Sequence, residues 1–185
     1  MKRIFIAVRI DPSEELLALM QELKNVLGRD RIKWVDHGIM HLTLVFLGDT
    51  EEKKIPELSS TLGECCTGSG ATVFKIRGLG VFRNLRDLRV IWAGVSDDGN
   101  LERLHKKIKT GLDEKGFPSE ERPFSPHLTL GRVKSVRKIN NVKNLLEKYS
   151  GREFQSVSVT EVILFESILM QTGPVYKPLD RFSLL

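Results

Sequence analysis

The tetrapeptide His-Leu-Thr-Leu occurs twice in this chain, at His41–Leu44 and, 86 residues later, at His127–Leu130. The same spacing brings Ile4-Phe5-Ile6-Ala7-Val8 onto Val90-Ile91-Trp92-Ala93-Gly94. An internal repeat of this kind predicts that two similar units build the chain. We therefore expect one bilobal domain over residues 1–185, with repeat halves of about 1–86 and 87–172 and a closing tail at 173–185.

Periodicity of apolar residues predicts the same order of elements in each half: strand, helix, strand, helix, strand. The expected strands are 3–10, 31–35, 40–47, 71–82, 88–95, 127–133, 154–166 and 174–184. The expected helices run from Ser13, as N-cap, to Gly28, and lie around 55–62, 101–112 and 139–146, with a connection from Pro118 to Pro126. This order predicts an α+β fold of two pseudo-symmetric lobes, each a mainly antiparallel sheet with helices on its outer face.

Alternation along a strand places the histidine and the threonine of each motif on one face and the two leucines on the other. The leucines suit a core under helices, so His41, Thr43, His127 and Thr129 are expected to project into a central cleft between the lobes. A single His-x-Thr is more often structural, but two copies in matching register favour a functional pair.

Two imidazoles across a cleft suit phosphodiester chemistry. Histidine has an ordinary pKa of about 6.5, so one ring can act as a base while its partner acts as an acid. Threonine hydroxyls can bind the non-bridging phosphate oxygens and hold the phosphorus in line. This arrangement requires no cofactor and no metal. The spacing of His37 and His41 lacks the glutamate of the metalloprotease helix, and His105 is expected to be exposed or to pack within a helix.

Composition narrows the class of protein. The sequence has 29 Lys and Arg against 24 Asp and Glu, a net charge of +5, which favours a polyanionic partner. No apolar run approaches the roughly 20 residues of a membrane span, and the N-terminus lacks the features of a signal peptide. The adjacent Cys65 and Cys66 form neither a disulfide framework nor a metal knuckle. We therefore expect a cytoplasmic protein, monomeric and with no membrane partner.

The two His-Leu-Thr-Leu segments resemble the signature of the 2H phosphoesterases. Further segments resemble the RNA 2′,3′-cyclic phosphodiesterases, also called 2′-5′ RNA ligases, within that superfamily: Arg3–Val8, Lys33–Val35, Phe46–Gly48, Gly78–Phe82, Leu130–Val133 and Gly173–Tyr176. The resemblance implies metal-independent hydrolysis of a 2′,3′-cyclic phosphate at an RNA 3′ end, tRNA-like or other, to a 2′-phosphomonoester. It also implies that His41 is the proton donor and His127 the proton acceptor.

The sequence leaves three other activities open. The same fold could join RNA reversibly through a 2′-5′ linkage, hydrolyse another cyclic or 2′-5′ phosphodiester, or bind RNA ends without turnover.

Four other residues are candidates for substrate binding. Arg132 can hold a phosphate bidentately, although strict alternation puts it on the leucine face, so it needs a bulge to reach the cleft. Lys33 and Trp34 precede the first motif, and Trp34 either stacks on a base or is buried. Tyr176 either lines the cleft or closes a sheet. The basic run Arg132–Lys138 either guides the RNA backbone or is an ordinary solvated face.

Overall fold

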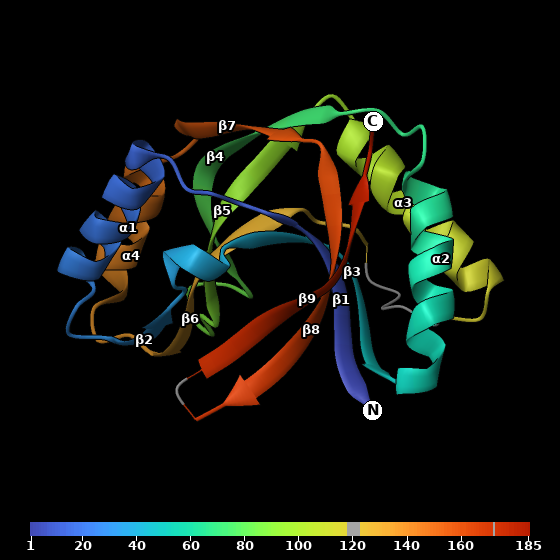
Figure 1. Ribbon diagram of the computed structural model, residues 1–185. Coiled ribbons are helices and arrows are strands. Elements are labelled where there is room, and N and C mark those ends of the chain that lie inside the picture. Colours follow the sequence, from blue (N-terminus) through green and yellow to red (C-terminus); the bar gives the residue numbers. More distant parts are fainter. Residues whose placement is uncertain (118–122, 172) are drawn as a thin grey trace.

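The computed structural model describes residues 1–117, 123–171 and 173–185, which form two antiparallel sheets with α-helices outside them (Figure 1). The α-helices are α1 Glu14–Val26, α2 Ile55–Cys66, α3 Asn100–Glu114 and α4 Ile139–Lys148, and short 3-10 helices lie at His37–Ile39 and Glu52–Lys54. The strands are β1 Lys2–Arg9, β2 Arg31–Trp34, β3 His41–Thr50, β4 Thr72–Phe82, β5 Val90–Asp97, β6 His127–Ser135, β7 Glu153–Val159, β8 Glu161–Met170 and β9 Gly173–Ser183. Among the described helices, none has the length and apolarity that crossing a membrane requires. The α+β class with two lobes is confirmed.

Local sequence accounts for the first helix. The Ser13 hydroxyl accepts a hydrogen bond from the Leu16 backbone N–H at 3.2 Å, so Ser13 is the N-cap as expected. The residues that α1 buries recur at helical spacing and enter the main core: Leu16, Leu19, Met20 and Leu23. The helix thus covers a sheet with one apolar stripe.

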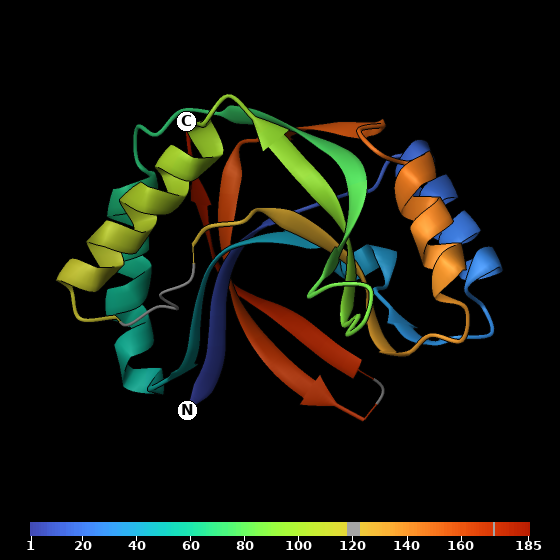
Figure 2. The same ribbon diagram turned by 180° about the vertical axis from the view of Figure 1, so that it is seen from behind.

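Each lobe takes elements from both halves of the sequence. One sheet has the order β3-β1-β8-β9 and the other β2-β6-β5-β4-β7. Strands β2 and β4 of the first half therefore lie in the sheet of the second half, and β8 of the second half lies in the sheet of the first. Each pair of helices also combines the two halves of the sequence. Helix α1 lies beside α4, and α2 lies beside α3 at the opposite outer side of the molecule (Figures 1 and 2). The two lobes are therefore pseudo-symmetric but do not coincide with the halves expected from the repeat. The positions of the repeat boundaries stay a prediction.

Two sequence expectations need correction. The single strand expected at 154–166 is two strands, because β7 ends at Val159 and β8 begins at Glu161 in the other sheet. The match between β1 and β5 is shifted by one residue, since Ala7 pairs with Thr43 whereas Trp92 pairs with Thr129. A shift of one residue reverses the face of every side chain in a strand. Part of the expected Pro118–Pro126 connection lies outside the described residues.

Candidate active site

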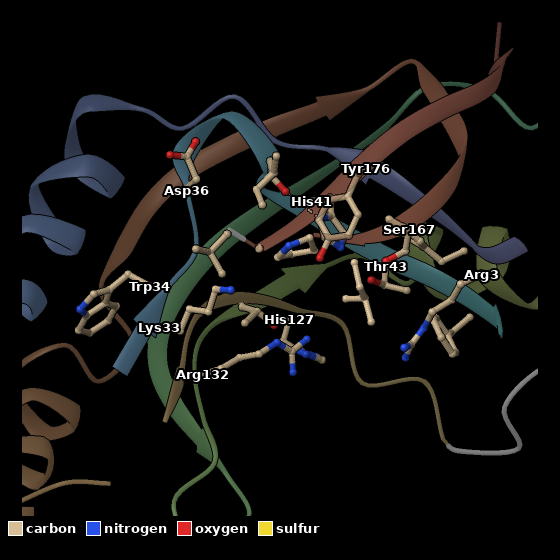
Figure 3. A pocket seen from close by; sticks show the side chains of 18 residues that line it. Arg3, Lys33, Trp34, Asp36, His41, Thr43, His127, Arg132, Ser167 and Tyr176 are labelled. Carbon is tan, nitrogen blue, oxygen red and sulfur yellow. Dashed lines mark hydrogen bonds between the residues drawn. The ribbon is translucent and has the colours of Figure 1, made fainter. Parts of the chain in front are cut away.

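His41 and His127 are the first residues of β3 and β6, the two strands that meet where the lobes join. Both side chains line one cleft of about 610 Å³ (Figure 3). The threonine two positions after each histidine, Thr43 and Thr129, lines the same cleft. The structure therefore brings together the four motif residues that the sequence placed on facing strands.

The two imidazoles are held in the same way. Nδ1 of His41 lies 2.8 Å from the carbonyl oxygen of Ile39, and Nδ1 of His127 lies 2.7 Å from that of Ser125. A carbonyl oxygen only accepts, so in each ring Nδ1 donates the hydrogen and Nε2 remains for exchange with a ligand. In both lobes the carbonyl belongs to the residue two positions before the histidine, which makes the pair geometrically equivalent.

The surroundings of the two rings differ. Phe5 and Tyr176 contact the His41 ring, with centroids 5.0 and 4.9 Å away. The rings of Phe82 and His127 form a T-shaped contact, with their centroids 4.7 Å apart. Burial lowers the pKa of His41 below its usual value near 6.5, and the positive charge of Arg132 lowers it further, although the bond to the Ile39 carbonyl acts in the opposite direction.

A β-bulge in each motif re-aims the residues that follow it. Leu44 has no partner on β1, because Ile6 pairs with Val45 and Ala7 with Thr43. Leu130 has no partner on β5, because Ile91 pairs with Gly131 and Trp92 with Thr129. One extra residue reverses the alternation of a strand beyond that point.

The bulge at Leu130 brings Arg132 into the cleft near His127 (Figure 3). Thr129 lines the same cleft. The bulge that Arg132 needed is therefore present. The matching bulge at Leu44 brings Phe46 to the cleft, although strict alternation from Leu42 and Leu44 places Phe46 on the leucine face. The pseudo-symmetric positions thus carry a cation in one lobe and an aromatic ring in the other.

Different groups satisfy the carbonyl oxygens of the two bulge residues. The backbone N–H of Val35 donates to the Leu130 oxygen at 2.9 Å. Nδ1 of His105, on α3, lies 2.8 Å from the Leu44 oxygen, and the His105 ring stacks on Phe124 at 4.0 Å. His105 is thus neither exposed nor a simple helix-packing residue, because it ties α3 to the first motif strand.

We expect His105→Ala to lower the free energy of unfolding by about 1–3 kcal/mol, because it leaves the buried Leu44 carbonyl without a donor. Urea denaturation measures this change. His37→Ala is the control, since the His37 side chain is 73% exposed, and it should change stability by no more than about 0.5 kcal/mol. An unchanged urea midpoint for His105→Ala would show that solvent replaces the lost bond.

The other predicted residues also line the cleft. Lys33 is exposed on β2 and lies directly opposite Arg132 of β6. Trp34 is partly buried and packs over Gly131, where an added Cβ would lie only 2.8 Å from the indole ring. Tyr176 fulfils both of its expected alternatives, because it lies on β9 of the first sheet and lines the cleft.

Sequence reasoning did not single out several residues that line the cleft. Arg3 lies over the Phe46 ring, with its guanidinium carbon 5.0 Å from the centroid. The remainder are Phe5, Val35, Asp36, Ile39, Phe46, Ser167, Leu169, Gly173 and Pro174. Alternation along β1 already placed Arg3 and Phe5 opposite the core residues Ile4 and Ile6, so a signal for those two was present.

The described part of the chain contains no group of three His, Cys, Asp or Glu side chains arranged to hold a metal ion. The chemistry that these residues themselves offer is acid–base catalysis by two imidazoles. The hydroxyls of Thr43 and Thr129 and the guanidinium of Arg132 can bind an anion between the two rings.

Comparison with known proteins adds independent information. Residues 12–168 match the sequence model of the 2′-5′ RNA ligase superfamily. The chain is 36% identical to an RNA 2′,3′-cyclic phosphodiesterase of Archaeoglobus fulgidus, with 98% of this chain and 99% of the relative covered. It is 35% identical to a protein of the same name from Thermotoga maritima, with 96% and 92% covered.

Solved structures share the fold. The crystal structure of TT0787 of Thermus thermophilus matches with a TM-score of 0.79 and 29% identity, covering 98% of this chain and 97% of that one. LigT of E. coli in its apo form matches with a TM-score of 0.75 at 24% identity, covering 98% and 96%, which supports the fold alone.

Proposed function

The chain belongs to the 2′-5′ RNA ligase superfamily, and on this premise we propose that it is an enzyme that hydrolyses the 2′,3′-cyclic phosphate at an RNA 3′ end. Membership of the family confirms the resemblance seen in the sequence. The observation that carries the proposal is the pair of equivalently held imidazoles, His41 and His127, which face one cleft and whose Nε2 atoms form no hydrogen bond with another described residue. The relatives from Archaeoglobus fulgidus and Thermotoga maritima, which bear the name of this activity, match nearly the full length of the chain.

The proposed reaction is a single in-line displacement. His127 takes a proton from water as the water oxygen bonds to phosphorus, and the bond from phosphorus to the 3′ oxygen breaks. His41 gives a proton to that 3′ oxygen, which leaves as a hydroxyl. The product is a 2′-phosphomonoester, and the two histidines have exchanged protonation states. A base on one side of the phosphorus and an acid on the other are what this geometry requires.

The remaining polar groups bind the phosphate in this proposal. Thr43 and Thr129 donate hydrogen bonds to its non-bridging oxygens, and Arg132 offers a charged fork to the oxygens on which charge builds up. Lys33, Trp34 and Tyr176 contact the nucleotide at the rim of the cleft. The monomeric state and cytoplasmic location expected from the sequence stay predictions.

Hydrolysis of an RNA oligonucleotide ending in a 2′,3′-cyclic phosphate tests the proposal, with and without EDTA. We expect a 2′-phosphate product and the same rate in both conditions. Loss of activity on chelation would contradict the metal-independent mechanism. A 2′-5′-linked oligonucleotide and a nucleoside cyclic phosphate, compared at equal concentration, separate the alternative substrates. Binding of the RNA end without any product would show a binding module instead.

Single-histidine variants test which ring is the donor. His41 must be protonated to act, so the residual kcat/KM of His127→Ala should fall as pH rises through the lowered pKa of His41, below about 6.5. In His41→Ala the remaining base must be neutral, so residual kcat/KM should rise with pH. Measuring kcat/KM of both variants from pH 4.5 to 8.5 gives the two slopes. The opposite slopes would exchange the two roles.

A further inference from the structure

The net charge of the protein is concentrated beside the cleft. Segments 29–34 and 132–138 carry seven basic residues and one acidic residue, Asp30. The basic residues are Arg29, Arg31, Lys33, Arg132, Lys134, Arg137 and Lys138. These segments therefore carry +6, and the rest of the chain, with 22 basic and 23 acidic residues, is close to neutral.

Ion pairs do not neutralise these seven cations. All seven are exposed, and within the described residues none has an ion-pair partner. Elsewhere on the surface pairing is common, as between Lys148 and Glu22 at 2.7 Å or Arg181 and Glu161 at 2.6 Å. Other cations, such as Lys24, Lys106 and Lys177, also lack an ion-pair partner among the described residues. What distinguishes this surface is that two short segments bring together seven such cations and a single carboxylate.

Strand pairing places four of the cations on one face. Lys33 of β2 lies opposite Arg132 of β6, and both line the cleft on its β2 side (Figure 3). Arg31 and Lys134 follow two positions along each strand, and the residues between them, Ile32 and Val133, pack into the core. The result is a double row of cations in which only Lys33 and Arg132 lie directly opposite each other, about 5 Å apart. A bulge at Lys134 makes Arg31 pair with Ser135, so the outer two cations are adjacent but out of register.

The two segments also continue as one surface beyond the sheet. The backbone N–H of Arg137 donates to the Asp30 carboxylate at 2.8 Å, which holds the segment after β6 against the start of β2. Arg29, Arg137 and Lys138 therefore extend the double row away from the cleft. We call the seven residues the cationic track.

Protection of a sheet edge does not account for the track. β2 is an edge strand, and exposed lysines and arginines commonly keep such strands from pairing with another chain. However, Arg132 and Lys134 belong to the interior strand β6, and like charges directly opposite each other destabilise a sheet. A ligand with regularly spaced negative charges would offset this repulsion.

We propose that the cationic track binds the backbone of the RNA strand on the 5′ side of the cyclic end, so that the preferred substrate is an RNA chain rather than a mononucleotide. This proposal rests on the proposed function. Phosphates leaving the cleft meet Lys33 and Arg132 first, then Arg31 and Lys134, then the cations beyond the sheet. Trp34 stands at the start of the track, where its ring can stack on a base, as in other single-strand grooves.

The test compares a single-stranded oligonucleotide of about eight residues, ending in a 2′,3′-cyclic phosphate, with a nucleoside 2′,3′-cyclic phosphate. Contact with about four phosphates predicts that log(kcat/KM) for the oligonucleotide falls with log[KCl] at a slope of about −2 to −3. The nucleoside, which has no further phosphates, should show little salt dependence.

The variant Lys134→Gln/Arg137→Gln removes two track cations that lie outside the cleft lining. We expect its KM for the oligonucleotide to rise about tenfold at low salt, with a salt slope shallower by about 1. Its kcat and its kinetics on the nucleoside should stay as in the parent. The control Lys53→Gln/Lys143→Gln removes the same charge from two ion-paired sites elsewhere and should leave both substrates unaffected.

The outcomes separate the two proposals. Hydrolysis of neither substrate would overturn the proposed function. Hydrolysis of both substrates with equal kcat/KM and equal salt slopes would leave the proposed function intact and contradict RNA binding by the cationic track. An equal loss on the oligonucleotide in the control variant would also overturn it, because it would trace the effect to net charge.

Discussion

Alanine in place of His41 or of His127 should lower kcat on a cyclic-phosphate RNA by about 10²–10⁴-fold, the usual contribution of general acid–base catalysis. In the proposed mechanism each ring acts at one end of the same displacement, and no third histidine is among the described residues that line the cleft. The double variant should therefore be only slightly slower than the worse single variant, since groups that act as a unit are not additive. Steady-state kinetics at saturating RNA measures the effect.

Two controls separate chemistry from folding. Asparagine at either position keeps a donor for the carbonyl of Ile39 or Ser125 but has no group that titrates near neutral pH, so it should be as inactive as alanine. His37→Ala removes an exposed imidazole four residues before His41, outside the cleft lining, and should retain full activity. If a histidine variant with normal urea stability kept more than a tenth of the parent kcat, the paired mechanism would be wrong.

Local periodicity in the sequence was enough to predict most elements of the fold. It could not reveal which strands pair, because alternation fixes the faces of a strand and not its neighbours. The pairing of β2, β4 and β8 with strands from the other half of the sequence is a long-range choice of this kind. The continuous apolar pattern at 154–166 likewise hid the break at Thr160, where the chain passes from one sheet to the other.

The motif residues were predictable for a physical reason: each histidine–threonine pair precedes the bulge and obeys strict alternation. Arg132 and Phe46 lie beyond a bulge, where alternation gives the wrong face. Gly131 at the second bulge was a weak signal, because glycine within a strand often marks one. No comparable signal precedes Phe46, where Val45 occupies the matching position.

Arg132→Gln should lower kcat/KM by about 10²–10³-fold, the cost of removing one preorganised donor from a developing phosphate charge. The bulge at Leu130 brings the guanidinium to the same cleft face as Thr129, where a charged fork can hold two phosphate oxygens. Arg132→Lys keeps the charge but not the fork, so it should recover only part of the loss. Lys143→Gln, on the exposed side of α4, is the control and should not change the rate.

A second measurement distinguishes a place in the cleft from a general structural role. The charge of Arg132 lowers the pKa of His41, so Arg132→Gln should raise that pKa, whereas Arg132→Lys should leave it closer to the parent value. NMR titration of the His41 ring protons in the free protein reports this shift directly. Because burial is the larger cause of the lowered pKa, His41 should still titrate below about 6.5 in both variants. A slow Arg132→Gln enzyme whose His41 titration is unchanged would mean that the guanidinium does not act at the histidine pair.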